Sequence, residues 1–191
     1  MDLTLLTHDG STDKQRRAAE SLASAIKRLI KQLLASSKIL VAAVNGKASG
    51  LGVTMLPYFD LVYASDKAEF SMEYARLGQI PEGFLSKEYL SSEMLLMGQS
   101  LTAKMAQESG LVSTVIWPSS FLEEIVPRLE SLEFMNDQGL SRIKQYMKRS
   151  LKERVLKVME SETQELIGIW SSVDFAKNVK NYLKCSHVVY Q

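Results

Sequence analysis

The sequence has one cysteine, two histidines and almost no net charge, and these shortages exclude several classes of protein. Cys185 has no second cysteine with which to form a disulfide inside the chain, which is typical of a reducing compartment. Twenty-three Lys and Arg residues against 22 Asp and Glu leave a formal net charge of +1, so composition gives no electrostatic reason to expect nucleic acid as a partner. His8 and His187 lie far apart in the sequence, and such a pair predicts no metal site.

Long apolar runs are also missing. No stretch approaches the roughly 20 apolar residues that a membrane-spanning helix needs, so no membrane partner is expected. The first ten residues, MDLTLLTHDG, resemble neither a secretory signal nor an Arg-rich transit peptide, and they predict no targeting signal. What is present is a chain of 191 residues, 46% of them hydrophobic, which is enough for one domain with a sizeable core.

Apolar periodicity predicts a β-rich centre followed by a helical tail. Apolar residues recur at three- and four-residue steps after Lys14, which predicts an amphipathic helix that is capped by Thr12 or Asp13 and ends at Ser36-Ser37. The continuously apolar residues 39–44 predict a strand buried on both faces. Further strands are expected at residues 60–65, 68–72 and 111–116, and helices at residues 52–58, 85–97, 102–110, 121–132, 140–147, 155–170 and 174–183.

The strongest sign of a ligand site lies within residues 41–79. An apolar strand runs into Asn45-Gly46, and a glycine-spaced turn, Gly50-Leu51-Gly52, opens onto an apolar segment. Backbone N–H groups at such a strand-to-helix turn lack intrahelical partners, so they can hold a negatively charged oxygen. The same glycines would also let a helix pack tightly against a strand, and the turn alone favours neither interpretation.

Several motifs, in one order, resemble the crotonase (enoyl-CoA hydratase/isomerase) superfamily. They lie at residues 43–56, 60–65, 68–70, 77–83, 98–103 and 109–112. Within the superfamily the chain is most similar to the 3-enoyl-CoA to 2-enoyl-CoA isomerases of peroxisomal and mitochondrial type. It is also similar to the crotonase-like domain of the chromodomain Y-like proteins, which share the run at residues 110–118. The resemblance implies an α/β fold with a truncated crotonase core (spiral ββα, here with an incomplete sheet) over residues 1–118 and a helical trimerisation region over residues 119–191.

The resemblance also implies a chemistry, the isomerisation of 3-enoyl-CoA thioesters in fatty-acid oxidation through an enolate held by two backbone N–H groups. Leu51 would supply one of these N–H groups. Glu82 would take a proton from C2 of the acyl chain and return it at C4, whereas without the resemblance a lone loop glutamate is usually just solvated. The substrate-binding residues that the resemblance implies are Asp2, Leu3, Gly50, Gly52, Met55 and Phe84. Acyl-CoA is then the ligand, no further cofactor is needed, and a homotrimer in mitochondria or peroxisomes is expected.

Three features depart from the family pattern. The two carboxylate positions of the hydratases hold Thr54 and Tyr74 here, which disfavours hydration, although Glu73 is adjacent. Asp2-Leu3 matches only the end of the segment that carries the second oxyanion N–H, so an N-terminally short core is expected. The stretch that follows Glu82 is also shorter than usual. The short N-terminus favours an alternative function, a non-catalytic crotonase-fold module that binds acyl-CoA or assembles through its helical tail, whereas the retained Pro81-Glu82-Gly83 favours the isomerase.

A basic cluster lies on the tail. Its members are Lys144, Lys148, Arg149, Lys152 and Arg154. Such a cluster is usually a solvated helix face. Because C-terminal helices contribute to the CoA pocket in this family, phosphate binding is the alternative.

Overall fold

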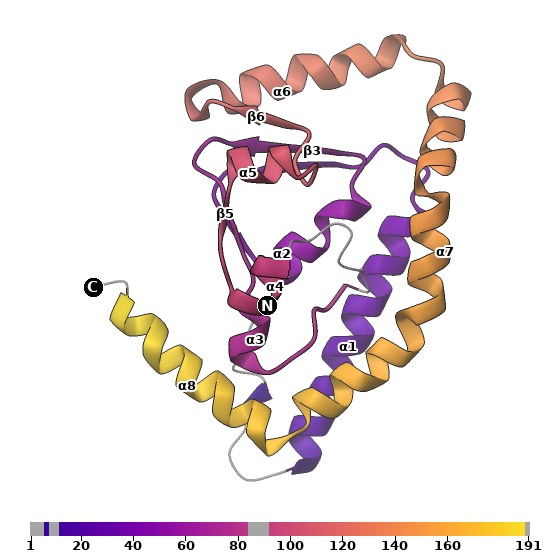
Figure 1. Ribbon diagram of the computed structural model, residues 1–191. Coiled ribbons are helices and arrows are strands. Elements are labelled where there is room, and N and C mark those ends of the chain that lie inside the picture. Colours follow the sequence, from indigo (N-terminus) through magenta and orange to yellow (C-terminus); the bar gives the residue numbers. More distant parts are fainter. Residues whose placement is uncertain (1–5, 8–11, 84–91, 190–191) are drawn as a thin grey trace.

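A computed structural model describes residues 6–7, 12–83 and 92–189, and the structural statements below concern these residues. Two small sheets lie at the centre, and the longest helices run along the outside of the molecule (Figure 1). The helices α1 and α7 lie side by side, and α8 turns back beneath the sheets (Figure 1). No helix in this part of the chain combines the length and the apolar character needed to cross a membrane.

The first sheet contains three parallel strands in the order β1-β3-β6. Its strands are β1 (Val41–Val44), β3 (Leu61–Ser65) and β6 (Thr114–Ile116). Residue 41 pairs with residue 61, and residue 63 with residue 114. The predicted burial of the first strand on both faces is wrong, because Ala43 is exposed and the other three residues of β1 are only half-buried. In the described part of the chain β1 is an outer strand of its sheet, so only one of its edges is covered.

The second sheet has the order β2-β4-β5 and contains β2 (Lys47–Ser49), β4 (Glu69–Ser71) and β5 (Leu101–Thr102). Strands β2 and β4 are parallel, and β5 is antiparallel to β4. Each strand of the parallel pair β1 and β3 is followed in the chain by a strand of the parallel pair β2 and β4. The turn at the proposed anion hole directly follows β2, so the pairing of β2 with β4 fixes its position.

The predicted helix at residues 52–58 is a short helix followed by a 3-10 turn, and residues 85–91 of the predicted helix 85–97 lie outside the described residues. The largest difference from prediction lies in the tail. Residues 140–170 form part of one continuous helix, not two, because no proline interrupts them and buried residues recur at every third, fourth or seventh position. An Asn136 side-chain oxygen caps this helix by accepting the Gly139 N–H at 2.8 Å. The helices are α1 (Thr12–Ala35), α2 (Leu51–Thr54), α3 (Tyr74–Leu77), α4 (Ser92–Met97), α5 (Ala103–Glu108), α6 (Phe121–Glu130), α7 (Asp137–Trp170) and α8 (Val173–Val189), with 3-10 turns η2 (Leu56–Tyr58), η4 (Pro118–Ser120) and η5 (Ser131–Phe134).

Three apolar clusters hold these elements together, and the smallest joins β3 and β6 to α6. Of the two larger clusters, one lies between the sheets and contains Phe70, Met72 and Met94. The other joins α1 to α7 and α8, and it is centred on the fully buried Ile30 and Trp170. This second cluster also takes in Tyr58 and Leu77, so side chains from both sides of residue 118 share one core. The division at residue 118 that the family resemblance implies stays a prediction.

Candidate active site

Glu82 is buried, with 1% of its surface exposed. It is therefore not the solvated side chain that a lone loop glutamate usually is. Its Oε2 accepts a hydrogen bond from Gln79 Nε2 at 2.9 Å, and Gln79 Oε1 accepts one from Trp170 Nε1 at 2.8 Å. These contacts hold the carboxylate in one orientation, with the last residue of α7 as their anchor.

The glycine-spaced turn places backbone donors beside this carboxylate. Gly50 has a φ of +55°, a conformation that favours glycine, and it precedes the first residue of α2. The Gly50 carbonyl accepts the N–H groups of Val53 and Thr54, whereas the Leu51 N–H lies near the Glu82 carboxyl and lowers its pKa. The structure therefore brings together Leu51 and Glu82, the two residues to which the sequence assigned catalytic roles.

A side chain at Gly50 would enter the same space. A Cβ built there lies 3.4 Å from Glu82 Oε1 and 3.7 Å from the Tyr74 hydroxyl oxygen. Gly83 is similarly constrained, since it has a φ of +114° and a Cβ there lies 3.0 Å from Thr54 Oγ1. Glycine at both positions thus keeps the surroundings of the carboxylate unobstructed.

The two positions that the family resemblance assigns to hydratase carboxylates hold Thr54 and Tyr74. Both residues are buried, and the Tyr74 hydroxyl lies near the Glu82 carboxyl and near the Thr54 hydroxyl. The neighbouring acid, Glu73, instead forms an ion pair with Arg76 at 3.2 Å and lies close to Gly98. Among the described residues, Glu82 is thus the carboxylate at the glycine-spaced turn.

Burial raises the pKa of the Glu82 carboxyl above its ordinary value of 4.5. Desolvation is the largest cause, because a charged carboxylate loses its hydration in the interior. The backbone N–H of Glu82, the Tyr74 hydroxyl and the Leu51 N–H lie near the carboxyl and oppose the shift without cancelling it. A carboxyl group whose pKa is moved toward neutrality can both accept and return a proton near neutral pH.

This raised pKa predicts how stability depends on pH. The folded protein keeps the Glu82 proton to a higher pH than the unfolded chain does, so the free energy of unfolding falls as pH rises from about 4.5 through the folded pKa. We expect Glu82→Gln, which has no proton to lose, to gain thermal stability relative to the wild type between about pH 4 and pH 8. Thermal melts across this range measure the difference. Glu20→Gln on the exposed face of α1 is the matched control, and an equal gain in both variants would contradict the assignment.

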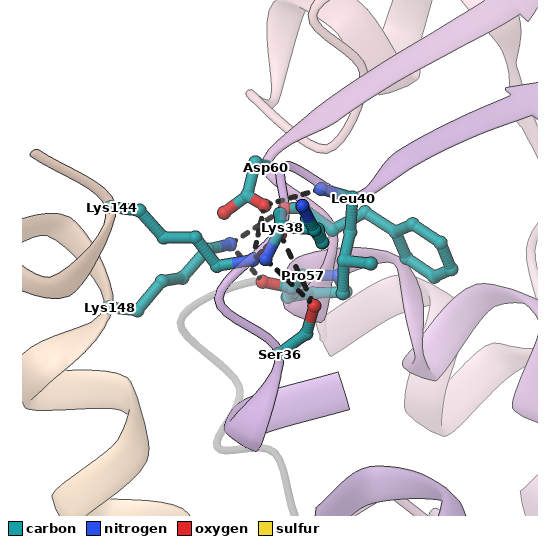
Figure 2. A network of polar contacts seen from close by, with 8 residues as sticks. Ser36, Lys38, Leu40, Pro57, Asp60, Lys144 and Lys148 are labelled. Atoms are coloured by element: carbon teal, nitrogen blue, oxygen red, sulfur yellow. Dashed lines mark hydrogen bonds and ion pairs between the residues drawn. The ribbon is translucent and has the colours of Figure 1, made fainter. Parts of the chain in front are cut away.

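The basic cluster of the tail is largely buried at its amino-terminal end, which corrects the expectation of a solvated face. Figure 2 shows Lys144 between α7 and the core, where its Nζ contacts Asp60 Oδ2 at 2.7 Å and the carbonyl oxygen of Lys38. Lys148 Nζ donates to the carbonyl oxygens of Pro57 and Phe59, at 2.8 Å and 2.6 Å.

These lysines hold α7 against the core because the chain exposes carbonyl groups there that helices and strands leave unpaired. Asp60 Oδ2 also accepts the Leu40 N–H at 2.7 Å. Burial lowers the pKa of Lys148, and the charge of Asp60 partly opposes this. Beside this contact, Arg149 and Lys152 line a pocket of about 470 Å³ that is closed on its other side by the end of α1.

A family model for enoyl-CoA hydratase/isomerase matches residues 6–191. The chain belongs to this family. It is 33% identical to human "Chromodomain Y-like protein" over 180 residues, which cover 91% of this chain and 30% of the relative. It is 32% identical to rat "Enoyl-CoA delta isomerase 2" over 189 residues, which cover 95% of this chain and 48% of the relative. The chain thus spans about a third to a half of the length of these relatives.

A solved member of the enoyl-CoA hydratase/isomerase family has the same fold. The crystal structure of an enoyl-CoA hydratase/isomerase from Pseudoalteromonas atlantica T6c matches with a TM-score of 0.77 and 27% identity. The match covers 82% of this chain and 66% of that one. The α/β crotonase fold inferred from the motifs is confirmed.

The remaining predicted site residues of this enoyl-CoA hydratase/isomerase family member divide into two groups. Gly52 lies in α2 beside Ala48, and Met55 packs against the core that α1 and α7 share. Their roles in binding acyl-CoA stay predictions, as do the catalytic roles of Leu51 and Glu82. Asp2, Leu3 and Phe84 lie outside the described residues.

Sequence reasoning missed three residues that position the site. Gln79 and Trp170 orient the carboxylate, and the Tyr58 hydroxyl donates to the carbonyl of Gly83, directly after Glu82. The available signal for Gln79 was a polar residue three positions before the acid, within the motif at residues 77–83. Trp170 had no such signal, since it was interpreted only as an apolar residue of the tail helix.

Proposed function

We propose that this protein isomerises 3-enoyl-CoA thioesters to 2-trans-enoyl-CoA thioesters, the conversion that the sequence motifs imply for fatty-acid oxidation. The observation that carries the proposal is the buried carboxylate of Glu82, the one fully buried acid in the described part of the chain, beside the Leu51 N–H, with hydroxyl groups at Thr54 and Tyr74 where a hydratase has acids. Hydration requires activation of a water molecule, whereas a 1,3-proton shift needs only one group that accepts and then returns a proton.

The steps follow from these groups. The Glu82 carboxylate removes a proton from C2, and the electrons of the C–H bond form the C1–C2 double bond of an enolate while charge develops on the thioester oxygen. The Leu51 N–H then stabilises this oxygen. Protonated Glu82 delivers the same proton to C4, the double bond moves to C2–C3, and the carbonyl group is restored.

A second candidate function is a non-catalytic module that binds acyl-CoA. The Glu82 carboxyl near the Leu51 N–H favours this alternative, because a carboxylate there competes with a thioester oxygen for the donor. The resemblance to human "Chromodomain Y-like protein" also leaves the reaction open, since that name describes no enoyl-CoA chemistry.

The test is to incubate the purified protein with 3-hexenoyl-CoA and follow the products by chromatography. We expect 2-hexenoyl-CoA to form and 3-hydroxyhexanoyl-CoA not to form from it. Calorimetric binding of hexanoyl-CoA without any turnover would overturn the isomerase proposal and support the binding module. A protein that neither binds hexanoyl-CoA nor converts 3-hexenoyl-CoA would contradict both functions.

Assembly and location stay predictions. A homotrimer and a mitochondrial or peroxisomal site are expected by resemblance, with acyl-CoA as the ligand and no further cofactor. Large apolar side chains are exposed on α6, on η5 and at the start of α7, where a contact between subunits would cover them. They include Leu122, Val126, Phe134, Met135, Ile143, Tyr146 and Met147.

A further inference from the structure

Tyr74 has a buried hydroxyl group that makes no hydrogen bond within the described part of the chain. The residue is the first of α3 and is only 3% exposed. The Thr54 hydroxyl and the Glu82 carboxyl lie near its oxygen, but neither meets the geometry of a hydrogen bond. Because buried polar groups are almost always paired, an unpaired hydroxyl in such a place needs a reason.

The hydroxyl points toward the proposed site of reaction. Its oxygen lies 3.7 Å from a Cβ built on Gly50, and Glu82 Oε1 lies 3.4 Å from the same point. The Leu51 N–H belongs to the peptide that directly follows Gly50. Three polar groups from different elements, α2, α3 and the loop after α3, therefore face one small volume. The tyrosine ring itself is held by the apolar cluster between the sheets.

The Tyr74 hydroxyl keeps the proton that it needs to act as a hydrogen-bond donor in that volume. Burial, together with the nearby charge of Glu82, raises its pKa, so the phenol keeps its proton throughout the physiological range. The Glu82 carboxyl already accepts a hydrogen bond from the Gln79 amide. The Tyr74 hydroxyl, which has no partner among the described residues, thus remains available to an acceptor that they do not supply.

We propose that the Tyr74 hydroxyl is a second hydrogen-bond donor to the thioester oxygen of a bound acyl-CoA, acting beside the Leu51 N–H. This inference rests on the proposed acyl-CoA function of the site. No proton leaves the tyrosine. The bond strengthens as the carbonyl oxygen becomes an enolate oxygen, which makes Tyr74 a catalytic residue in the isomerisation. It also assigns a role to a hydroxyl at a position where a hydratase has a carboxylate.

The experiment compares Tyr74→Phe with Tyr63→Phe, a matched loss of one hydroxyl from the buried tyrosine on β3. We expect Tyr74→Phe to lower kcat for 3-hexenoyl-CoA about 100-fold with little change in KM. Hexanoyl-CoA should bind about 3- to 10-fold more weakly, and this readout does not depend on turnover. The pH at which the rate is half-maximal should not move. Tyr63→Phe should match the wild type in all three measurements.

Other outcomes would overturn the proposal. Wild-type affinity and kcat in Tyr74→Phe would show that the hydroxyl does not contact the ligand. A pH–rate profile displaced to higher pH would show instead that the hydroxyl donates to the Glu82 carboxylate, since losing that donor would raise the carboxyl pKa further. If the wild type itself binds no acyl-CoA, the proposed function fails and the inference fails with it.

Discussion

Replacing Glu82 by glutamine is expected to lower kcat for 3-hexenoyl-CoA by about 10²- to 10⁴-fold. The amide has nearly the shape of the carboxyl group, so it can still accept a hydrogen bond from Gln79 and fill the same buried position. It cannot take up the C2 proton. The loss should therefore appear in kcat and leave the affinity for hexanoyl-CoA within a few-fold of the wild type, measured by stopped-time assays and calorimetry.

Glu73→Gln is the matched control for this change. Glu73 lies nine positions earlier, and its carboxylate is paired with Arg76 outside the cluster around Gly50. We expect its isomerase rate to stay close to that of the wild type. A large loss of rate in Glu73→Gln with normal turnover in Glu82→Gln would show that Glu73, not Glu82, is the base. Equal rates in the wild type and both variants would show that Glu82 takes no part in the mechanism.

Asp60→Asn should destabilise the protein by about 3–5 kcal/mol. The Asp60 and Lys144 side chains are only 10% and 9% exposed, so removing the carboxylate leaves the ammonium group of Lys144 buried without its counter-charge. The Leu40 N–H also loses a charged acceptor. Urea denaturation followed by circular dichroism gives the change in the free energy of unfolding.

Two further variants make this prediction specific. Combining Asp60→Asn with Lys144→Met should cost less than the sum of the two single changes, because the double variant buries no unpaired charge. Glu20→Gln, which breaks an exposed pair with Arg16, should cost no more than about 0.5 kcal/mol. A similar small cost for Asp60→Asn would mean that Lys144 is solvated and does not hold α7 against the core.

Elements with their own start and stop signals were predicted well from the sequence. Helix α5 has Thr102 as its cap and Gly110 just beyond its end, and the structure shows Thr102 Oγ1 accepting the Met105 N–H at 3.3 Å. The strands β2 and β5 and the helix α3 were missed. Each has two to four residues, which is too few to show a period, and the two strands exist because they pair with β4. Pairing partners that lie 22 or more positions away leave no local pattern.

The candidate site, like the fold, was predicted only in part. The motifs identified Leu51 and Glu82, and the structure brings the Leu51 N–H to the Glu82 carboxyl. The burial of this carboxyl could not be predicted, because it depends on contacts with the turn before α2, with α3 and with Gln79 that form only in the folded chain. The hydrogen bond between Gln79 and Trp170 spans 91 positions and joins a loop to the end of the tail. Sequence spacing carries no information about such a contact.

The length of α7 has a consequence for the proposed base. Lys144 fixes the helix to the core near one end, and Trp170 reaches Gln79 from the other, 26 residues or about 39 Å further along. A single inserted or deleted residue between them would rotate Trp170 by about 100° around the helix axis and withdraw it from Gln79. The number of residues between Lys144 and Trp170 therefore determines whether Trp170 faces Gln79, and through Gln79 it determines how the Glu82 carboxylate is oriented. Substitutions on its solvent face leave that alignment intact, whereas a change in its length does not.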